Sequence, residues 1–98
     1  MKKLETKEVE ELFEAILSLK TIEECRMFFE DACTVKEVLD VAQRLKAAKM
    51  LKKGENYVNV CKATGMSSAT VSRVNRCLEY GSGGYELILE RLGESEEK

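Results

Sequence analysis

Proline, histidine and tryptophan are absent from this chain of 98 residues, and glycine occurs only six times. Proline breaks a helix and glycine weakens it, so a chain with so little of either can form long helices. Three tyrosines and three phenylalanines are the only aromatic residues, which predicts an aliphatic core. Because histidine is absent, zinc sites that combine cysteine with histidine are excluded.

The four cysteines show no C-x-x-C spacing. A four-cysteine zinc site, a disulfide pair or a redox switch is therefore the weaker alternative. We interpret the cysteines as small apolar residues of a protein in a reducing compartment. They are Cys25, Cys33, Cys61 and Cys77.

Catalytic and membrane functions also find no support in the sequence. No nucleophile–base pair and no paired carboxylates in an evident cleft indicate an enzyme. No apolar run approaches the roughly eighteen residues of a membrane span, and no signal-peptide core follows Met1. We therefore expect a cytoplasmic protein with no catalytic residue, no metal, no required cofactor and no membrane partner.

The apolar spacing is that of an all-α protein, and 44% hydrophobic residues suffice for the core of a single domain over residues 1–98. Thr21 with Glu24, and Thr34 with Glu37, form two capping boxes that each predict a helix start. Six helices are expected, namely about 6–19, one after Thr21, 35–53, two in a helix-turn-helix at 56–80, and a closing helix within 84–92. An acidic tail at 93–98 is expected to be flexible.

The stretch from Tyr57 to Glu79 has the spacing of a helix-turn-helix. Gly65 ends the first helix, because glycine takes a positive φ at no steric cost. The turn follows at Met66-Ser67-Ser68, and Ser67 or Ser68 caps a second helix over 69–78.

The second helix of this motif has one apolar and one polar face. Val71 and Val74 lie three residues apart, so together with Met66 they are expected to be buried and to pack the two helices together. The outward strip has no carboxylate before Glu79. Such a strip can enter a major groove, where serine and arginine reach base edges and phosphates and alanine touches a thymine methyl. Its members are Ser68, Ala69, Ser72, Arg73 and Arg76.

Positive charge is concentrated around this motif. Residues 44–76 carry eight Lys/Arg and one Asp/Glu, whereas residues 1–43 carry six and eleven and residues 77–98 carry two and six. A local basic patch on a chain of net charge −2 favours a nucleic-acid surface, and a solvated basic face on two ordinary helices is the alternative.

The glycine-rich segment 81–84 follows the motif. No lysine follows it and no strand precedes it, so it does not match a phosphate-binding loop. We interpret it as a helix end and a tight corner.

The first, third and last helices have apolar faces broader than a monomer of this size can cover. We expect a homodimer built on the helices of residues 6–53, since a two-fold pair also reads two half-sites about one helical turn apart. A compact monomer whose apolar faces are all internal is the alternative.

At this point the chain resembles the Trp repressor in the order of its elements. The run Ala69-Thr70-Val71-Ser72-Arg73 is similar to the start of the repressor's recognition helix, and Arg44 occupies a matching place in the long helix. The resemblance covers roughly residues 9–92. The segment from Gly81 to Tyr85 is more similar to Trp-repressor-like proteins of the YerC/YecD type.

This resemblance implies an intertwined, all-helical homodimer that binds operator DNA. It also implies that Arg44 and Arg73 line a ligand pocket, because the matching arginines of the repressor hold tryptophan between them. The repressor has glycine where this chain has Val74, whose branched side chain would intrude on that pocket. A small-molecule corepressor stays open, but L-tryptophan is disfavoured.

The hypothesis is therefore a sequence-specific DNA-binding transcriptional regulator, repressor-like and homodimeric, with double-stranded DNA as its partner. Use of the motif for protein or RNA interaction is the alternative. The expected DNA-binding residues are Ser67, Ser68, Ala69, Thr70, Ser72, Arg73 and Arg76, with Lys52, Lys53 and Lys62 on phosphates.

Overall fold

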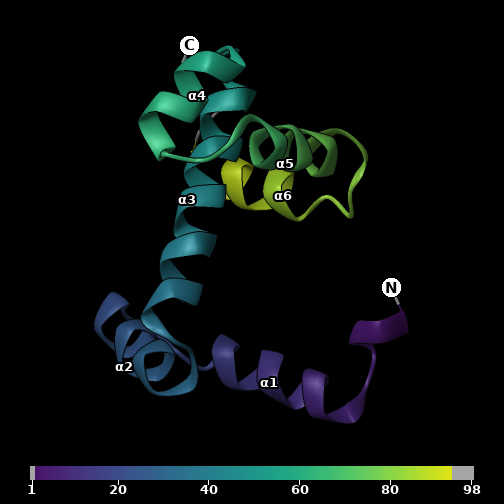
Figure 1. Ribbon diagram of the computed structural model, residues 1–98. Helices are drawn as coiled ribbons and strands as arrows, with labels where there is room; N and C mark the ends of the chain where they lie inside the picture. The colour runs from purple at the N-terminus through teal and green to yellow at the C-terminus, as the bar shows by residue number, and fades with distance from the viewer. Residues whose placement is uncertain (1, 94–98) are drawn as a thin grey trace. The chain divides into compact units, whose positions relative to one another are not determined.

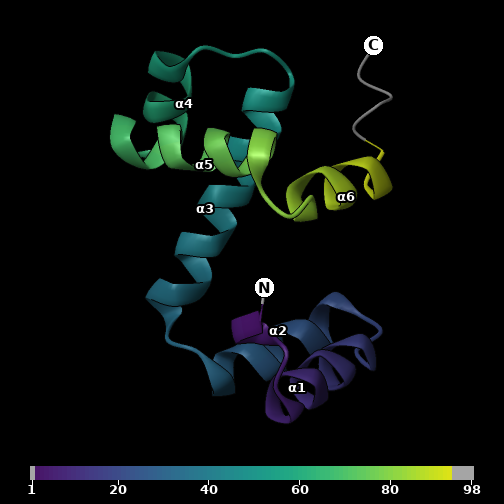
Figure 2. The same cartoon turned by 90° about the vertical axis from the view of Figure 1, so that its right-hand side faces the viewer.

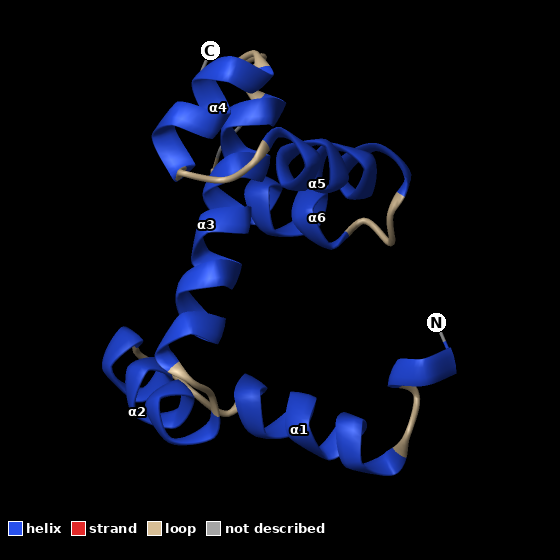
Figure 3. Cartoon of the chain, in the orientation of Figure 1, coloured by secondary structure: helices blue, strands red, loops and turns tan. Residues whose placement is uncertain are grey.

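The computed structural model describes residues 2–93, which form six α-helices and one short 3-10 helix and contain no strand (Figures 1 and 3). The all-α class and the order of the six α-helices are confirmed, whereas the 3-10 helix is not predicted by the sequence. The predicted tail lies outside the described residues from residue 94 onward. The elements are η1 (Lys2–Leu4), α1 (Lys7–Leu17), α2 (Ile22–Ala32), α3 (Val35–Lys52), α4 (Tyr57–Thr64), α5 (Ser68–Tyr80) and α6 (Gly84–Arg91).

Residues 1–38 form the first of two compact units, which contains α1, α2 and the start of α3. The predicted capping box at Thr34 is complete, whereas the one at Thr21 forms only one of its two reciprocal bonds. The Glu37 N–H donates to Thr34 Oγ1 at 3.1 Å, and the Thr34 N–H donates to Glu37 Oε1 at 2.9 Å. In the other box the Glu24 N–H donates to Thr21 Oγ1 at 3.0 Å, while the Glu24 carboxylate accepts the N–H of Lys20 at 2.8 Å. These bonds satisfy N–H groups that the first turn of a helix leaves without partners.

This first unit has no fully buried side chain among its described residues. Several of its large apolar side chains are instead exposed, with Leu17 82% and Ile22 76% accessible. Phe28 and Phe29 contact each other edge to face with ring centroids 5.1 Å apart. The unit therefore presents the apolar faces that periodicity predicts but covers none of them completely.

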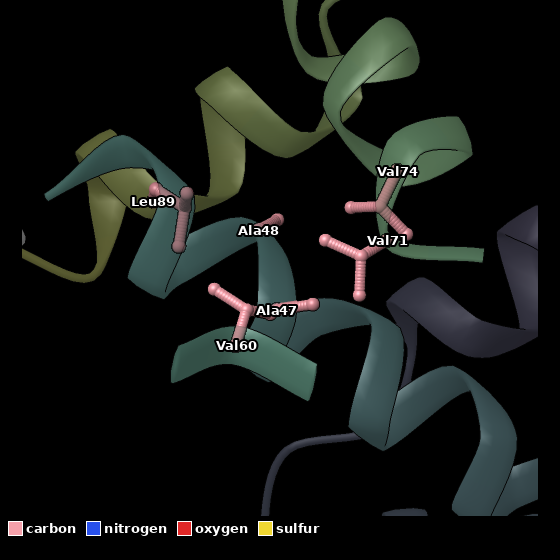
Figure 4. Close-up of a cluster of buried hydrophobic side chains, with 6 residues drawn as sticks. All are labelled: Ala47, Ala48, Val60, Val71, Val74 and Leu89. Carbon is pink, nitrogen blue, oxygen red and sulfur yellow. The ribbon is translucent and has the colours of Figure 1, made fainter. Parts of the chain in front are cut away.

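Residues 39–98 form the second unit, whose core lies where four helices meet. Figures 1 and 2 show α4, α5 and α6 beside the C-terminal part of α3. Small residues of α3 allow the other helices to approach closely, and dense packing of this kind is sensitive to changes of single methyl groups. Figure 4 shows the buried side chains, which are Ala47, Ala48, Val60, Val71, Val74 and Leu89.

Two glycines form the corners on either side of α5. Gly65 ends α4 with a φ of 75°, and its N–H donates to the Cys61 carbonyl at 2.8 Å. Gly81 ends α5, and a Cβ at this position would collide with the Cys77 carbonyl oxygen. The prediction that segment 81–84 is a helix end and corner is confirmed.

Candidate nucleic-acid interface

The turn between α4 and α5 is built by local hydrogen bonds. Thr64 Oγ1 donates to the Val60 carbonyl at 2.7 Å and accepts the Met66 N–H at 3.2 Å. Ser67 is the N-cap of α5, because its Oγ accepts the Thr70 N–H at 3.2 Å. Of the two serines that the sequence allows as the cap, the structure therefore selects Ser67.

A polar contact joins this turn to the long helix. Gln43 Nε2 donates to the Thr64 carbonyl at 2.7 Å, across 21 positions of the chain. One turn along α3, Lys46 Nζ lies 3.4 Å from the Ala63 carbonyl. Both carbonyls belong to the last turn of α4, where helix carbonyls have no helical partner. Gln43 and Lys46 thus position the motif, and sequence reasoning missed them because neither contact is local.

The two faces of α5 match the sequence prediction. Val71 is fully buried and Val74 is 3% exposed. Met66 is only half-buried, because it lies in the turn before α5 and packs at the margin of the core. The outward positions Ser68, Ala69, Ser72, Arg73 and Arg76 are all exposed.

Two further residues that the sequence predicts to bind DNA lie at the start of α5. Ser67 is exposed and Thr70 is half-buried, with their hydroxyl oxygens 3.1 Å apart. Both hydroxyls therefore help to shape the helix start, whatever else they contact. The N–H groups of a first helical turn favour negative charge nearby, which suits a DNA phosphate.

The three lysines predicted to contact phosphates are all exposed. Lys53 lies just after α3, and Lys62 lies in the last turn of α4. Lys52 Nζ lies 2.8 Å from Glu86 Oε1 of α6. The hydrogen bond to Glu86 raises the pKa of Lys52 from its ordinary value of 10.5, despite partial desolvation. Lys52 thus has a partner within the chain, and its contact with a DNA phosphate stays a prediction.

Arg44 and Arg73, 29 positions apart in the numbering, line the same cavity of about 160 Å³. Cys77, one helical turn after Arg73, could have been added from its spacing. Tyr85 could not, because it reaches the cavity only through the corner between α5 and α6. The complete lining is Arg44, Thr70, Arg73, Val74, Cys77 and Tyr85.

Residues 2–93, which the structure describes, carry neither a metal-binding cluster nor a membrane-spanning helix. No cluster of three or more cysteine, aspartate or glutamate side chains there could hold a metal ion. All four cysteines are free thiols. None of the described helices combines the length and the apolar character that a membrane span requires.

The fold and the exposed basic face of α5 define the class of all-α helix-turn-helix proteins. Residues 7–93 match the sequence model of the family described as Trp repressor protein, and the chain belongs to that family. The resemblance drawn from Arg44 and the run 69–73 is thereby confirmed.

Individual relatives agree with this placement. The uncharacterized protein YerC of Bacillus subtilis (strain 168) is 51% identical over 94 residues, which cover 96% of this chain and 90% of that protein. The crystal structure of a TrpR-like protein from Eubacterium eligens ATCC 27750 has a TM-score of 0.92 and 52% identity, covering 95% of this chain and 96% of that one. A candidate Trp repressor from Staphylococcus aureus has a TM-score of 0.88 and 46% identity, covering 93% and 91%.

Proposed function

We infer that the protein is a transcriptional regulator that binds duplex DNA sequence-specifically, as a homodimer, through α5 of the helix-turn-helix. The observation that carries this proposal is the division of α5 into two faces. Val71 and Val74 fix the helix on the core, while Arg73 and Arg76 extend from its exposed face. A helix anchored in this way can enter a major groove without losing its own packing.

The proposed DNA contacts are of two kinds, those that reach base edges and those that bind phosphates. Arg73 and Arg76 have the forked donors that bind a guanine edge or a phosphate in two places. Ser68, Ala69 and Ser72 are short enough to let the helix approach the bases. Phosphate contacts, which position the protein without reading sequence, come from Ser67, Thr70, Lys53 and Lys62.

The charge distribution supports the same proposal. Residues 44–76 contain eight basic residues and only one acidic residue, Glu55. Each phosphate that such residues neutralise releases counterions, so affinity falls steeply with salt. Acidic flanks keep the net charge at −2, which confines the attraction for DNA to this segment.

The homodimer is supported by the apolar faces of α1 and α2. Leu17, Ile22 and Met27 are each at least 65% exposed, and residues 1–38 contain no buried side chain among those described. A second copy of the chain would cover such faces, and large exposed apolar patches on a monomer favour association. Two copies also supply two recognition helices, which raises affinity for a two-fold site.

The experiment that tests this function is selection of duplex DNA from a random pool by the purified protein, at low and at moderate salt. We expect enrichment of a palindrome with half-sites about one helical turn apart, roughly 34–36 Å. On the selected duplex, Arg73→Ala and Arg76→Ala should each weaken binding about tenfold to a hundredfold.

Arg26→Ala is the matched control, because it removes the same group from α2, where Arg26 Nη1 lies 3.6 Å from Glu23 Oε2. It should leave DNA affinity unchanged. Unchanged affinity in both α5 variants would contradict the assignment of α5. Strong RNA binding without preference for any duplex would instead favour the alternative use of the motif.

A further inference from the structure

The cavity beside α5 shares Arg73 with the face that we assign to DNA. Arg44 of α3, Arg73 of α5 and Tyr85 of α6 belong to three different helices and line the same space of about 160 Å³. A group bound in this space would contact α5 together with α3 and α6. The contents of the cavity therefore bear on the position of the DNA-binding helix.

One wall of the cavity is a core residue. Val74 lines the cavity and is 3% exposed, and Figure 4 shows it in the buried cluster with Val71. A valine in a helix is restricted to essentially one side-chain rotamer, so it does not turn aside for a ligand. The space that Val74 occupies is therefore permanently filled.

A second wall is held in place by α6. Tyr85 is half-buried and packs against the same core. The next residue, Glu86, is paired with Lys52 at 2.8 Å, and Leu89, one turn further along α6, is fully buried. These two anchors fasten α6 to the rest of the unit and keep Tyr85 at the cavity.

The space that remains is small. An apolar cavity of about 150 Å³ accepts benzene. The remaining 160 Å³ is similar, whereas a free amino acid with an indole side chain adds a second ring, an ammonium group and a carboxylate. The ligand implied by the Trp repressor family is therefore larger than the space that these residues leave.

We propose that Val74 and Tyr85 hold α5 in its DNA-binding position, as a bound corepressor would. The protein then binds DNA without an indole-sized ligand. This inference rests on the proposed DNA-binding function. Its physical basis is that packed side chains supply the support that a bound ring would supply elsewhere. The position of α5 is then constant instead of being set by a metabolite.

The test creates the missing space and then fills it. Val74→Ala should enlarge the cavity, and Tyr85→Ala should open it from the α6 side. Val71→Ala is the matched control, because Val71 is equally buried in α5 but does not line the cavity. Each variant and the wild type are melted with and without indole or L-tryptophan, and their affinity for the selected duplex is measured in parallel.

We expect indole to raise the melting temperature of Val74→Ala or Tyr85→Ala, but not that of the wild type or Val71→Ala. The opened variants should bind DNA roughly tenfold more weakly, with recovery when indole is added. Wild-type DNA affinity or melting temperature that rises with L-tryptophan would overturn the proposal. So would the same response to indole in the opened variants and Val71→Ala.

The melting-temperature measurements need no DNA, so they distinguish a failure of this inference from a failure of the proposed function. A wild type that binds no duplex, together with a stabilising effect of indole confined to the opened variants, would contradict DNA binding and leave the inference about Val74 and Tyr85 supported. Tyr85→Ala is the second variant in case Val74→Ala fails to fold, since Tyr85 is only half-buried.

Discussion

At the scale of single residues, glycine is required at position 81 because the backbone of Cys77 lies close to it, and not because of an unusual backbone angle. The φ of Gly81 is −82°, which other residues adopt, but a Cβ would meet the Cys77 carbonyl oxygen. That carbonyl accepts the Gly81 N–H at 2.8 Å, so neither group can move without loosening the end of α5. The corner that leads to α6 therefore requires glycine here.

We predict that Gly81→Ala lowers the free energy of unfolding by more than about 1 kcal/mol, because the added methyl displaces the backbone. Gly84→Ala is the control: a Cβ at Gly84 meets nothing within 4 Å, and alanine favours the helix that begins there. Urea denaturation at equal protein concentration compares the two. Equal stability of the two variants would show that the collision is relieved without loss.

Burial of Val71 and Val74 could be predicted because a three-residue spacing places both on one helix face. The degree of burial of Met66 could not be predicted in the same way, because Met66 lies outside the helix and its burial depends on how α4 and α5 pack. The pairing of Lys52 with Glu86 spans 34 positions, so no local pattern contains it. Lys52 was therefore assigned to DNA on the sign of its charge alone.

At the scale of elements, the start of α5 depends on one side chain. Ser67 Oγ accepts the Thr70 N–H at 3.2 Å, whereas Ser68 is the first helical residue and makes no capping bond of this kind. Ser67→Ala should lower the free energy of unfolding by about 1 kcal/mol, the usual value for an N-cap. Ser68→Ala should change it by less than about 0.5 kcal/mol. Thermal or urea unfolding of both proteins checks this, and an equal loss in both would reject Ser67 as the cap.

The attachment of α6 to α3 gives a prediction about pH. The hydrogen bond to Glu86 raises the pKa of Lys52 above its ordinary value of 10.5. The Lys52–Glu86 pair therefore stabilises the fold fully below pH 10.5, and this stabilisation is lost as the pH rises through the folded-state pKa of Lys52. Glu86→Gln should therefore lower the melting temperature by the same small amount at pH 7 and pH 9, with the difference shrinking above pH 10.5. Leu89→Ala, which removes a fully buried side chain, should lower it much more at every pH. A difference that grows at alkaline pH would contradict the ion pair.

Helix bounds and caps were accessible from sequence because they depend on residues three or four positions apart. Thr34 with Glu37 and Gly65 after α4 are examples, and each lies where the pattern predicts. The contact of Gln43 with the Thr64 carbonyl and the arrival of Tyr85 at the cavity are different, since both depend on tertiary packing. The exposed face of α5 was thus predictable, but not the contacts that hold the helix in position.

At the scale of the whole molecule, the two units contrast in how well their apolar residues are covered. The described residues of 39–98 include six buried hydrophobic residues, whereas none of the described residues of 1–38 is buried. Side chains such as Leu17 and Ile22 would be unfavourable in water if they stayed exposed. If the proposed homodimer covers these side chains, the stability of the molecule should depend on protein concentration.

The apolar face of α1 supplies the prediction that tests this dependence. Phe13 is 44% exposed and lies within the apolar arc of α1, while Glu11, two residues earlier, lies about 160° away around the helix. We expect Phe13→Lys to shift the protein from dimer to monomer, because a lysine in an apolar interface has no partner for its charge. Glu11→Lys introduces the same group on the opposite face and should leave the dimer intact. Light scattering with size-exclusion chromatography measures the mass of both variants.

Since paired recognition helices are needed for a two-fold site, Phe13→Lys should also lose most of its affinity for the selected palindrome. A monomeric wild type at the concentrations at which it binds that duplex would contradict the dimer.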